Sequence, residues 1–549
     1  MNEAPCGLNV LCSLRRVLPG TVPRILVALA LATVSPMTTA AKSTTHGSSA
    51  TASPAVRRAG PAGSLLIVES NHAIPLVYLA VAARGGYASD PRHQDGLTNL
   101  AAELARRGAG QRTRAQLDDA LDQLGATLDV ETDADAVRLV GHVLARNLDP
   151  FLTILGDIVV RPQLDAAELA RTRREIAAQI DESRNDDQAL CARFFVRNLY
   201  GDHPYGRSPD GTHASLEALG IEEVAAHYRR QFVGKNLIFA AAGDVDAADL
   251  AARLGRAFNG LRPGWSEAEA PTASERPPER ARSRSPDNQA ASKASGSKAS
   301  ASRAPASKVA ASKASASKVA PSKPAEKDLT LRAPVPPSGW RIQLVDKPDR
   351  QQTQIMFGHA GPPATDPDFV PLQVALAAFG GHGMTSTLME EVRSKRGLAY
   401  GAYMTLSQRR GAGAVAGWVF SSNDKVVSTL KLVLKLYVSF MDKGLEPAQV
   451  ATFQSFLAGS YASEMDAPEP RLEARLAAEL AGLPPDFVDT FAARVRAVTA
   501  KEVNAAIARQ VHARDLAITL VSTASVMKRL LVDAKIKDSA IDVIDFEKE

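Results

Sequence analysis

The stretch IEEVAAHYRRQFVGKNL at residues 221–237 has a counterpart later in the chain, and this pair indicates how the chain is organised. Residues 500–516, AKEVNAAIARQVHARDL, align with it without gaps at an offset of 279 positions and share six identities with it. A second pair of similar segments, VYLAVAARGGYASDP and TQIMFGHAGPPATDP, ends at Asp90-Pro91 and Asp366-Pro367, at an offset of 276. Two separated matches at nearly the same offset predict a duplicated domain.

Each copy shows the same coarse order of elements. A strand is followed by a turn, a long helix, further strands and helices, and a last strand such as NLIFAAAG at 236–243. Apolar residues recur with helical spacing over Leu97–Ala105 and over 168–180. Strands and helices segregated in this way predict an α+β fold. We therefore expect two homologous α/β sandwich domains, each with helices packed on a mostly antiparallel sheet.

A repetitive segment separates the two copies. Residues 263–339 are rich in Ala, Ser, Lys and Pro, and Ser-Lys or Ser-Arg recurs every five residues between 292 and 323. A period of five gives no continuous apolar stripe on a helix or a strand, so we expect a disordered linker between domains at 63–262 and 340–549. The linker is either a soluble spacer or a weak contact for an anionic surface.

The charge of the chain is concentrated in this linker. Residues 288–325 contain seven basic and no acidic residues, whereas the whole chain has a formal charge of +5. The remainder of the chain is therefore close to neutral, and the sequence pI of 9.0 does not indicate nucleic-acid binding.

The N-terminal residues have the pattern of a secretory signal. Arg15 and Arg16 precede a short apolar run at 25–34 and small residues at 38–41. We predict a signal peptide at 1–41, a disordered leader at 42–62, and export to the periplasm; a buried N-terminal helix is the alternative. Removal of the signal leaves Cys191 as the single cysteine, and we expect it to be a small buried apolar residue rather than a nucleophile.

Several segments resemble one family of metallopeptidases. They are Gly96-Leu97 at the start of a helix, LYGDHPYGR at 199–207, and residues 236–245 ending in Gly-Asp-Val. In this order and spacing the chain resembles the insulinase and pitrilysin peptidases, the inverzincins, over about 63–262 and 340–540. The resemblance implies a helix that in active members carries His-x-x-Glu-His.

The metal motif of that family is replaced in this chain. In active members the two histidines bind zinc, the glutamate is the general base, and a distant glutamate completes the site. Here Asn99 and Glu103 stand at the histidine positions and Ala102 at the base position; an ungapped register puts Gln179 at the distal position, with Glu182 a second candidate. These side chains offer only oxygen donors to a metal, which suit calcium or magnesium better than zinc. We therefore expect no catalytic residue and no cofactor in this chain.

The second half keeps a different family signature, RSKRGLAY. Its first and last residues, Arg393 and Tyr400, match an Arg/Tyr pair that binds substrate in the family. A guanidinium and a phenol can donate hydrogen bonds to a peptide carbonyl or to an oxyanion. The alternative is that the two side chains end a helix and cover core. The glycine-rich stretch 379–388 upstream is expected to be a flexible loop that faces the substrate.

These expectations define one function and one alternative. The chain would be the substrate-binding subunit of an exported zinc peptidase that acts on unfolded peptides or proteins, which would add as a strand to a sheet edge. Its partner would be a homologous two-domain subunit with an intact motif and its zinc. The alternative is a scaffold or binding protein of the cell envelope with the same fold and no role in proteolysis.

Overall fold

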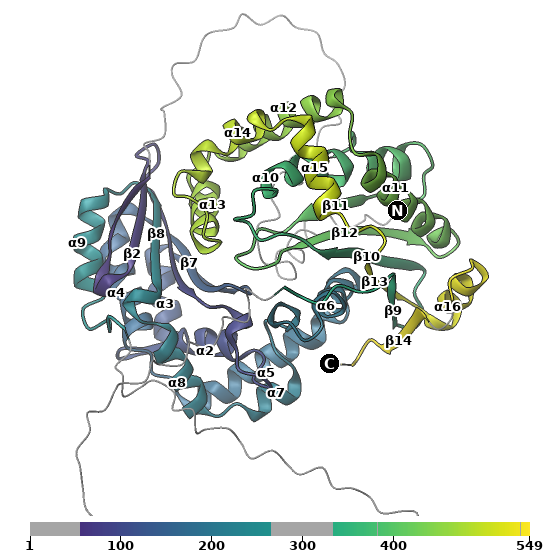
Figure 1. The fold of residues 1–549 in the computed structure, drawn as a ribbon. Helices are drawn as coiled ribbons and strands as arrows, with labels where there is room; N and C mark the ends of the chain where they lie inside the picture. The colour runs from purple at the N-terminus through teal and green to yellow at the C-terminus, as the bar shows by residue number, and fades with distance from the viewer. Residues whose placement is uncertain (1–54, 265–332, 382, 538–539, 549) are drawn as a thin grey trace, which may run out of the picture. The chain divides into compact units, whose positions relative to one another are not determined.

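The computed structural model describes residues 55–264, 333–381, 383–537 and 540–548 (Figure 1). The predicted signal peptide, residues 42–54 of the predicted leader and residues 265–332 of the predicted linker lie outside these ranges. Both predicted domains belong to one compact unit.

Six strands form the first sheet, in the order β1-β2-β8-β3-β7-β6. All neighbours are antiparallel except β2 and β8, which run parallel. The strands are β1 Val56–Ala59, β2 Leu65–Ser70, β3 Leu76–Arg84, β6 Thr127–Thr132, β7 Ala136–Leu144 and β8 Leu237–Gly243. The short strands β4 Gly108–Ala109 and β5 Arg112–Thr113 pair separately.

The second sheet has the order β11-β12-β10-β13-β9-β14. Its three pairs from β11 to β13 are antiparallel, whereas β13–β9 and β9–β14 are parallel. The strands are β9 Arg341–Asp346, β10 Gln352–Ala360, β11 Ala402–Leu406, β12 Ala414–Ser422, β13 Ala517–Ser522 and β14 Ile541–Asp545. The predicted α+β class with mostly antiparallel sheets is confirmed.

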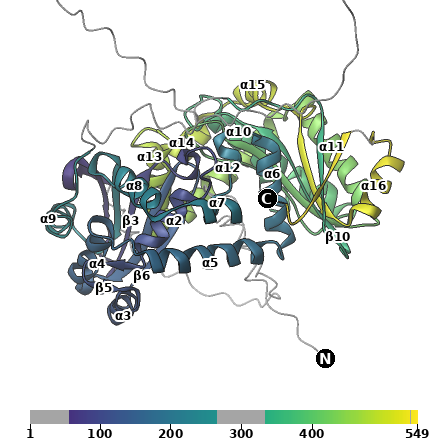
Figure 2. The ribbon, with the colours of Figure 1, turned by 90° about the horizontal axis from the view of Figure 1, so that it is seen from below.

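Apart from α3, the helices follow the same order in the two halves. Those of the first half are α2 Leu97–Ala105, α3 Arg114–Leu124, α4 Leu148–Val160, α5 Ala166–Ser183, α6 Asp187–Tyr200, α7 His213–Ala218, α8 Ile221–Gln231 and α9 Ala247–Ala257. Those of the second half are α10 Phe369–Leu376, α11 Val426–Lys443, α12 Pro447–Glu464, α13 Pro468–Leu480, α14 Phe487–Ala497, α15 Ala500–Gln510 and α16 Ala524–Asp533. Helices α2, α5 and α7 lie next to one another (Figure 2).

The structure confirms the duplication. The strand order β2-β8-β3-β7-β6 repeats as β9-β13-β10-β12-β11. The helices of the quoted sequence pair, α8 and α15, begin and end at the same offset of 279 residues, and β3 and β10 do so at 276. Strand β1 occurs only in the first half and β14 only in the second, and both lie outside the repeated order.

Each sheet is covered on one face by a helix of the other half. Helix α6 packs against the second sheet, where Leu190 and Phe195 belong to the same buried cluster as Met356. Helix α13 packs against the first sheet, where Leu476 shares a cluster with Ala80. Because both faces of the central strands are buried, these strands have continuous apolar sequences rather than alternating ones.

Buried charges fix α13 on the first sheet. Glu69 on β2 is fully buried, and its carboxylate lies 2.9 Å from Nε of Arg475 and also pairs with Arg471. Arg475 pairs in turn with Asp489 at 2.6 Å. Removing one member of such a buried set is far more costly than removing a surface pair.

One predicted boundary is wrong, and one prediction about a single residue is confirmed. Residues 56–59 were expected in the disordered leader, but they form β1, antiparallel to β2. All four β1 residues are on the exposed edge of the sheet, so composition does not distinguish this strand from a leader. Cys191 is fully buried and burial raises the pKa of its thiol, as expected for a small core residue.

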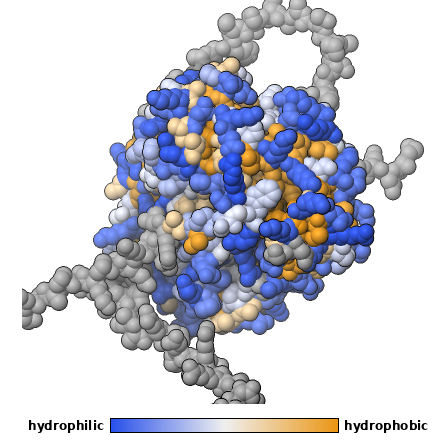
Figure 3. Space-filling model, turned by 45° about the vertical axis from the view of Figure 1, so that its right-hand side comes forward, coloured by the Kyte–Doolittle hydropathy of each residue, from blue (hydrophilic) through white to orange (hydrophobic). Residues whose placement is uncertain are grey.

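No helix within the described ranges is both long and apolar enough to cross a bilayer. Figure 3 shows one face of the molecule, on which hydrophobic residues gather in patches between hydrophilic ones.

Candidate functional site

Helix α2 carries the motif positions, and a buried carboxylate fixes its first turn. Asp90 accepts hydrogen bonds from the main-chain N–H groups of Gly96 and Thr98, both at 3.0 Å. The Thr98 hydroxyl donates to Asp90 at 2.6 Å and lies 2.8 Å from Nε2 of His227 on α8. Burial raises the pKa of Asp90 to about 7 and lowers that of His227 to about 4. Gly96 has a φ of 87°, and a Cβ there would come within 2.9 Å of the Asp210 backbone.

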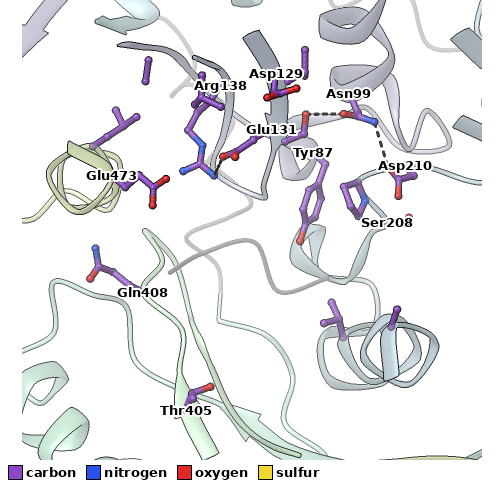
Figure 4. Close-up of a pocket in the computed structure, with 18 of the residues that line it drawn as sticks. Tyr87, Asn99, Asp129, Glu131, Arg138, Ser208, Asp210, Thr405, Gln408 and Glu473 are labelled. Atoms are coloured by element: carbon purple, nitrogen blue, oxygen red, sulfur yellow. Dashed lines mark hydrogen bonds and ion pairs between the residues drawn. The ribbon is translucent and has the colours of Figure 1, made fainter. Parts of the chain in front are cut away.

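The first two motif positions, Asn99 and Ala102, are engaged by the rest of the fold rather than open to a metal. The Thr132 hydroxyl donates to Oδ1 of Asn99 at 2.9 Å, and Nδ2 of Asn99 donates to Asp210 at 3.3 Å (Figure 4). Ala102 is fully buried in the hydrophobic core of the first half. Both ends of the Asn99 amide are therefore engaged, and the base position presents a methyl group to the core.

The third motif position belongs to an ion-pair network. Glu103 accepts from Arg107 at 3.4 Å, Arg107 pairs with Glu175 on α5 at 2.8 Å, and Glu175 pairs with Arg114 at 2.9 Å. Burial raises the pKa of Glu103, although Arg107 opposes this shift. Desolvation would also raise the pKa of Glu175, but Arg114 and Arg107 outweigh it and hold that pKa below its usual value. A guanidinium thus joins two carboxylates across α2 and α5.

The distal position is exposed. Gln179 and the second candidate, Glu182, both lie on α5 with exposed side chains. The carboxylate of α5 that does reach the charges of α2 is Glu175, one turn before Gln179, and the sequence analysis missed it. The sequence contained one indication of this ion-pair network. Arg107 follows Glu103 by four residues, and opposite charges at this spacing can pair on a helix.

The residues at these four positions do not fit a zinc ion. A zinc site needs at least three nitrogen, sulfur or carboxylate ligands arranged around one ion. Here the Asn99 amide is hydrogen-bonded at both ends, Ala102 has no donor, Glu103 is paired with Arg107, and Gln179 offers an amide. Within the part of the chain that the structure describes, no group of three His, Cys, Asp or Glu residues is placed to hold a metal. We therefore derive no catalytic step through a metal in this chain.

A cavity of about 2140 Å³ opens beside these positions. Asn99, Glu103 and Gln179 line it. Strand β6 and residues of both halves, among them Glu131 and Gln408, also line it (Figure 4). The second half contributes a wall from α12, α13 and α14, which carries the carboxylates of Glu464, Glu469 and Glu473 beside apolar residues. This wall includes Leu457, Tyr461, Leu472, Leu476 and Phe491.

Strand β6 is an edge strand within this cavity. It pairs with β7 on one side and has no strand partner on the other among the described residues. The Leu128 carbonyl already accepts a hydrogen bond from Nε of Arg106 at 2.8 Å. A free sheet edge can receive an extended peptide through main-chain hydrogen bonds, with little demand on its sequence.

The two predicted substrate-binding residues of the second half lie elsewhere. Neither Arg393 nor Tyr400 is among the residues that line the cavity. Tyr400 is 75% exposed and stacks on Phe420 with a centroid separation of 6.5 Å. Arg393 is exposed near the end of a π-helical segment, Met389–Ser394. The exposure of Tyr400 excludes a role in covering core, and the substrate role of both residues stays a prediction.

The glycine-rich stretch has a packing role that the sequence did not reveal. Ala377–Gly381 forms a second π-helical turn, and a Cβ on Gly380 would come within 2.9 Å of Met404 on β11. Gly381 lines the cavity. His382 lies outside the described residues, so the predicted flexible loop is described only in part.

The loop between β11 and β12 attaches to the first half next to the cavity. Arg409 is buried, and its guanidinium lies 5.2 Å from the centre of the Tyr205 ring. The Tyr205 hydroxyl donates to Asp135 at 2.6 Å and accepts from the Gly411 N–H at 2.9 Å. Tyr200 donates to the carbonyl of Ala412 at 3.0 Å. The aromatic residues of the LYGDHPYGR segment therefore anchor this loop to the first half. Nothing in the sequence indicated that Arg409 takes part in this contact.

Known proteins match both halves. Residues 65–213 match the family described as insulinase (peptidase family M16), and residues 307–456 match the peptidase M16 inactive domain. A non-peptidase homolog from Helicobacter pylori, YmxG, is 22% identical over 459 residues, which is 83% of this chain and 91% of that protein.

Solved structures have the same fold. A peptidase M16 inactive domain from Pseudomonas fluorescens superposes with a TM-score of 0.68 at 19% identity, over 85% of this chain and 97% of that one. The first half of the periplasmic protease PqqL from Escherichia coli superposes with a TM-score of 0.63 at 12% identity, over 89% of this chain and 96% of that one.

The duplicated α/β sandwich and its altered motif helix define a metallopeptidase homologue without the His-x-x-Glu-His ligands. The chain belongs to the M16 insulinase family of peptidases, and the resemblance stated from the sequence is confirmed.

Proposed function

We propose that this chain is the non-catalytic, substrate-binding subunit of an exported zinc metallopeptidase heterodimer that acts on unfolded peptides or proteins. One observation carries the proposal: the three motif positions of α2 are committed to the fold, while a free sheet edge still lies in a cavity of about 2140 Å³ beside them. A family relative named a non-peptidase homolog supports it.

The chemistry of hydrolysis has to come from another chain. Ala102 cannot accept a proton, and general-base assistance contributes about 10²–10⁴-fold to such reactions. The partner would be a homologous two-domain subunit with an intact His-x-x-Glu-His motif, which would bind the zinc. This chain would contribute the peptide-binding edge of β6 and the donor groups of Arg393 and Tyr400, both of which are exposed.

The proposal of export rests on the sequence of residues that lie outside the described ranges. The basic, apolar and small-residue order of residues 1–41 is that of a signal peptide. A similar solved structure is that of a periplasmic protease, which supports the periplasm as the compartment.

The test is a peptidase assay on purified chains. The full chain without residues 1–41 is mixed with the homologous subunit that carries the intact motif, and cleavage of a quenched fluorescent peptide is followed with and without a zinc chelator. We expect no cleavage by this chain alone, and an increase of about tenfold or more in the mixture over the zinc subunit alone. Zinc-dependent cleavage by this chain alone would overturn the proposal.

Variants separate the proposed role from a purely structural one. Arg393→Ala and Tyr400→Phe should each lower activity of the mixture while leaving the assembled complex intact on size-exclusion chromatography. Arg396→Ala removes an exposed guanidinium of the same segment that pairs with Glu391, and it should leave activity unchanged. If the Arg393 and Tyr400 variants are as active as the parent, the scaffold alternative becomes the better description.

A further inference from the structure

Helix α11 presents a row of lysines to solvent. They are Lys425 at its N-cap, Lys431, Lys435 and, at its last position, Lys443, and all four side chains are exposed. With about 3.6 residues per turn, these four positions lie within an arc of about 120° around the helix axis. At about 1.5 Å per residue, the row is about 27 Å long. The lysines therefore form one basic surface, which we call the α11 face.

The α11 face has more cations than carboxylates. Its carboxylate Asp442 pairs with Arg514 at 2.9 Å, and Asp424 stands next to Lys425 in the chain. Lys425 also donates to the carbonyl of Gly397 at 3.3 Å, which satisfies a hydrogen bond but leaves the charge in place. The other three lysines make no hydrogen bond or ion pair with any other described residue. Together with Arg514, the face therefore has five cations and two carboxylates.

Apolar side chains lie among these lysines. Leu432 and Leu436 each follow a lysine of the face by one residue, and both are only partly buried against the core of the second half. The right-hand side of Figure 1, where α11 lies, is turned forward in Figure 3, and hydrophobic residues gather there between hydrophilic ones. Lysine stems are themselves aliphatic, so the face combines positive ends with an apolar base. This combination is typical of helices that lie on a membrane surface.

The α11 face lies on the side of the second sheet away from α6. Val433 of α11 and Phe357 of β10 belong to one buried cluster, whereas Met356, the neighbouring residue of β10, packs with α6. Successive side chains of a strand point to opposite faces, so the two helices cover opposite faces of this sheet. Residues of α6 line the cavity, and none of the described α11 residues does. A contact through the α11 face therefore leaves the cavity open to a peptide.

We propose that the α11 face docks this chain on a bilayer that contains anionic phospholipid. The lysine ends bind lipid phosphates, and the exposed parts of Leu432 and Leu436 contact the boundary between head groups and acyl chains. A row of cations about 27 Å long matches a plane of many phosphates better than it matches one small anion. Each lysine held near such a surface strengthens binding about fivefold. The inference goes beyond the proposed function and does not depend on it.

Sedimentation with lipid vesicles tests the inference. The full chain without residues 1–41 is mixed with vesicles of phosphatidylcholine alone or with about 30% phosphatidylglycerol, at about 0.05 M salt. We expect binding to the anionic vesicles to be tighter by about tenfold or more. Raising the salt to about 0.5 M should remove most of this difference, because salt screens exposed charges. Equal binding to both kinds of vesicle would overturn the inference.

Charge-removing variants assign the binding to α11. Lys431→Gln with Lys435→Gln should weaken binding to anionic vesicles by about tenfold or more. The matched control, Lys235→Gln with Arg256→Gln, removes two exposed cations of the first half and should bind as the parent does. The seven basic residues of 288–325 are present in every protein, so their contribution is the same throughout. All variants should keep the melting temperature of the parent, which shows that the substituted helix is folded.

Two further outcomes decide whether a membrane is the partner. If the α11 variant binds anionic vesicles as tightly as the parent does, another part of the chain makes the contact and the inference is overturned. Dextran sulfate, a soluble polyanion, is the second probe. If it binds the parent in an α11-dependent way whereas anionic vesicles do not bind, the face takes a soluble polyanion and the inference is overturned. None of these results changes the expected outcome of the peptidase assay, so the two proposals are tested separately.

Discussion

Ala102 occupies the position where a proton-accepting carboxylate would stand, and the core has closed around it. It is fully buried among the apolar residues of the first half. Glu103 on the same helix pairs with Arg107, which lies just beyond the end of the helix, and Arg107 pairs in turn with Glu175 on α5. Helices α2 and α5, which a zinc ion joins in active family members, are joined here by a guanidinium.

Two buried groups near the start of α2 should shape the pH dependence of stability. The pKa of Asp90 is about 7 in the folded chain, so the folded state binds more protons than the unfolded state between about pH 4 and 7, and the unfolding free energy falls as pH rises. The pKa of His227 is about 4, so between about pH 4 and 6.5 the unfolded state binds more protons and the unfolding free energy rises with pH. The two effects oppose each other.

Asp90→Asn should expose the effect of His227. Its unfolding free energy, measured by urea denaturation from about pH 4.5 to about pH 7, should rise more steeply with pH than that of the parent. Exposed Asp119→Asn, on α3, serves as the control and should follow the parent curve. Parallel curves for Asp90→Asn and the parent would show that Asp90 does not titrate in this range.

At the scale of elements, the sequence predicted those whose pattern is set by local periodicity. Helix α2 and strand β8 were recognised from spacing or an apolar run, and the offset between α8 and α15 revealed the duplication. Strand β1 was missed because an exposed edge strand has no buried face and so no alternating pattern. The π-helical turn at Ala377–Gly381 was missed because its glycines read as a loop.

The candidate site was predicted only where it depends on one helix. The replaced motif positions could be read from the sequence, because a helix fixes the spacing of its own residues. Their partners come from other elements: Thr132 and Asp210 bond Asn99, and Glu175 pairs with Arg107, the partner of Glu103. No local pattern encodes contacts between residues 33 to 111 positions apart, and for the same reason the attachment of Arg409 to Tyr205 was not predicted.

Helix α13 should depend strongly on one buried carboxylate. Glu69→Gln removes the charge that faces Arg471 and Arg475, and we expect the unfolding free energy to fall by about 3 kcal/mol. The control, Asp442→Asn, removes a carboxylate from an exposed pair with Arg514 and should cost less than about 1 kcal/mol. Chemical denaturation measures both values, and equal losses would contradict the assigned role of Glu69.

At the scale of the whole molecule, the two halves depend on each other through α6 and α13. Each helix covers the sheet of the other half with apolar side chains. Polar contacts add to this packing, among them the pair of Lys347 with Asp187 and the hydrogen bond from Nδ2 of Asn198 to the carbonyl of Ile518 at 3.1 Å. We therefore expect the halves to remain associated without a covalent connection.

Cleavage between the halves tests this dependence. A specific protease site inserted within residues 265–332 should yield two fragments that elute together on size-exclusion chromatography under native conditions, with a melting temperature within a few degrees of the intact chain. The same fragments should separate in denaturant, which is the control for complete cleavage. Separation under native conditions would show that α6 and α13 do not hold the halves together.

Helices α6 and α13 each cover the sheet of the other half, and this arrangement also affects how such a chain can change over evolutionary time. Substituting a zinc ligand abolishes one reaction but leaves every buried surface covered. Deleting either half would expose a sheet face of the other, which the cell's proteases and chaperones would recognise as unfolded. A gene of this kind can therefore lose its chemistry residue by residue, while selection for solubility keeps both halves together.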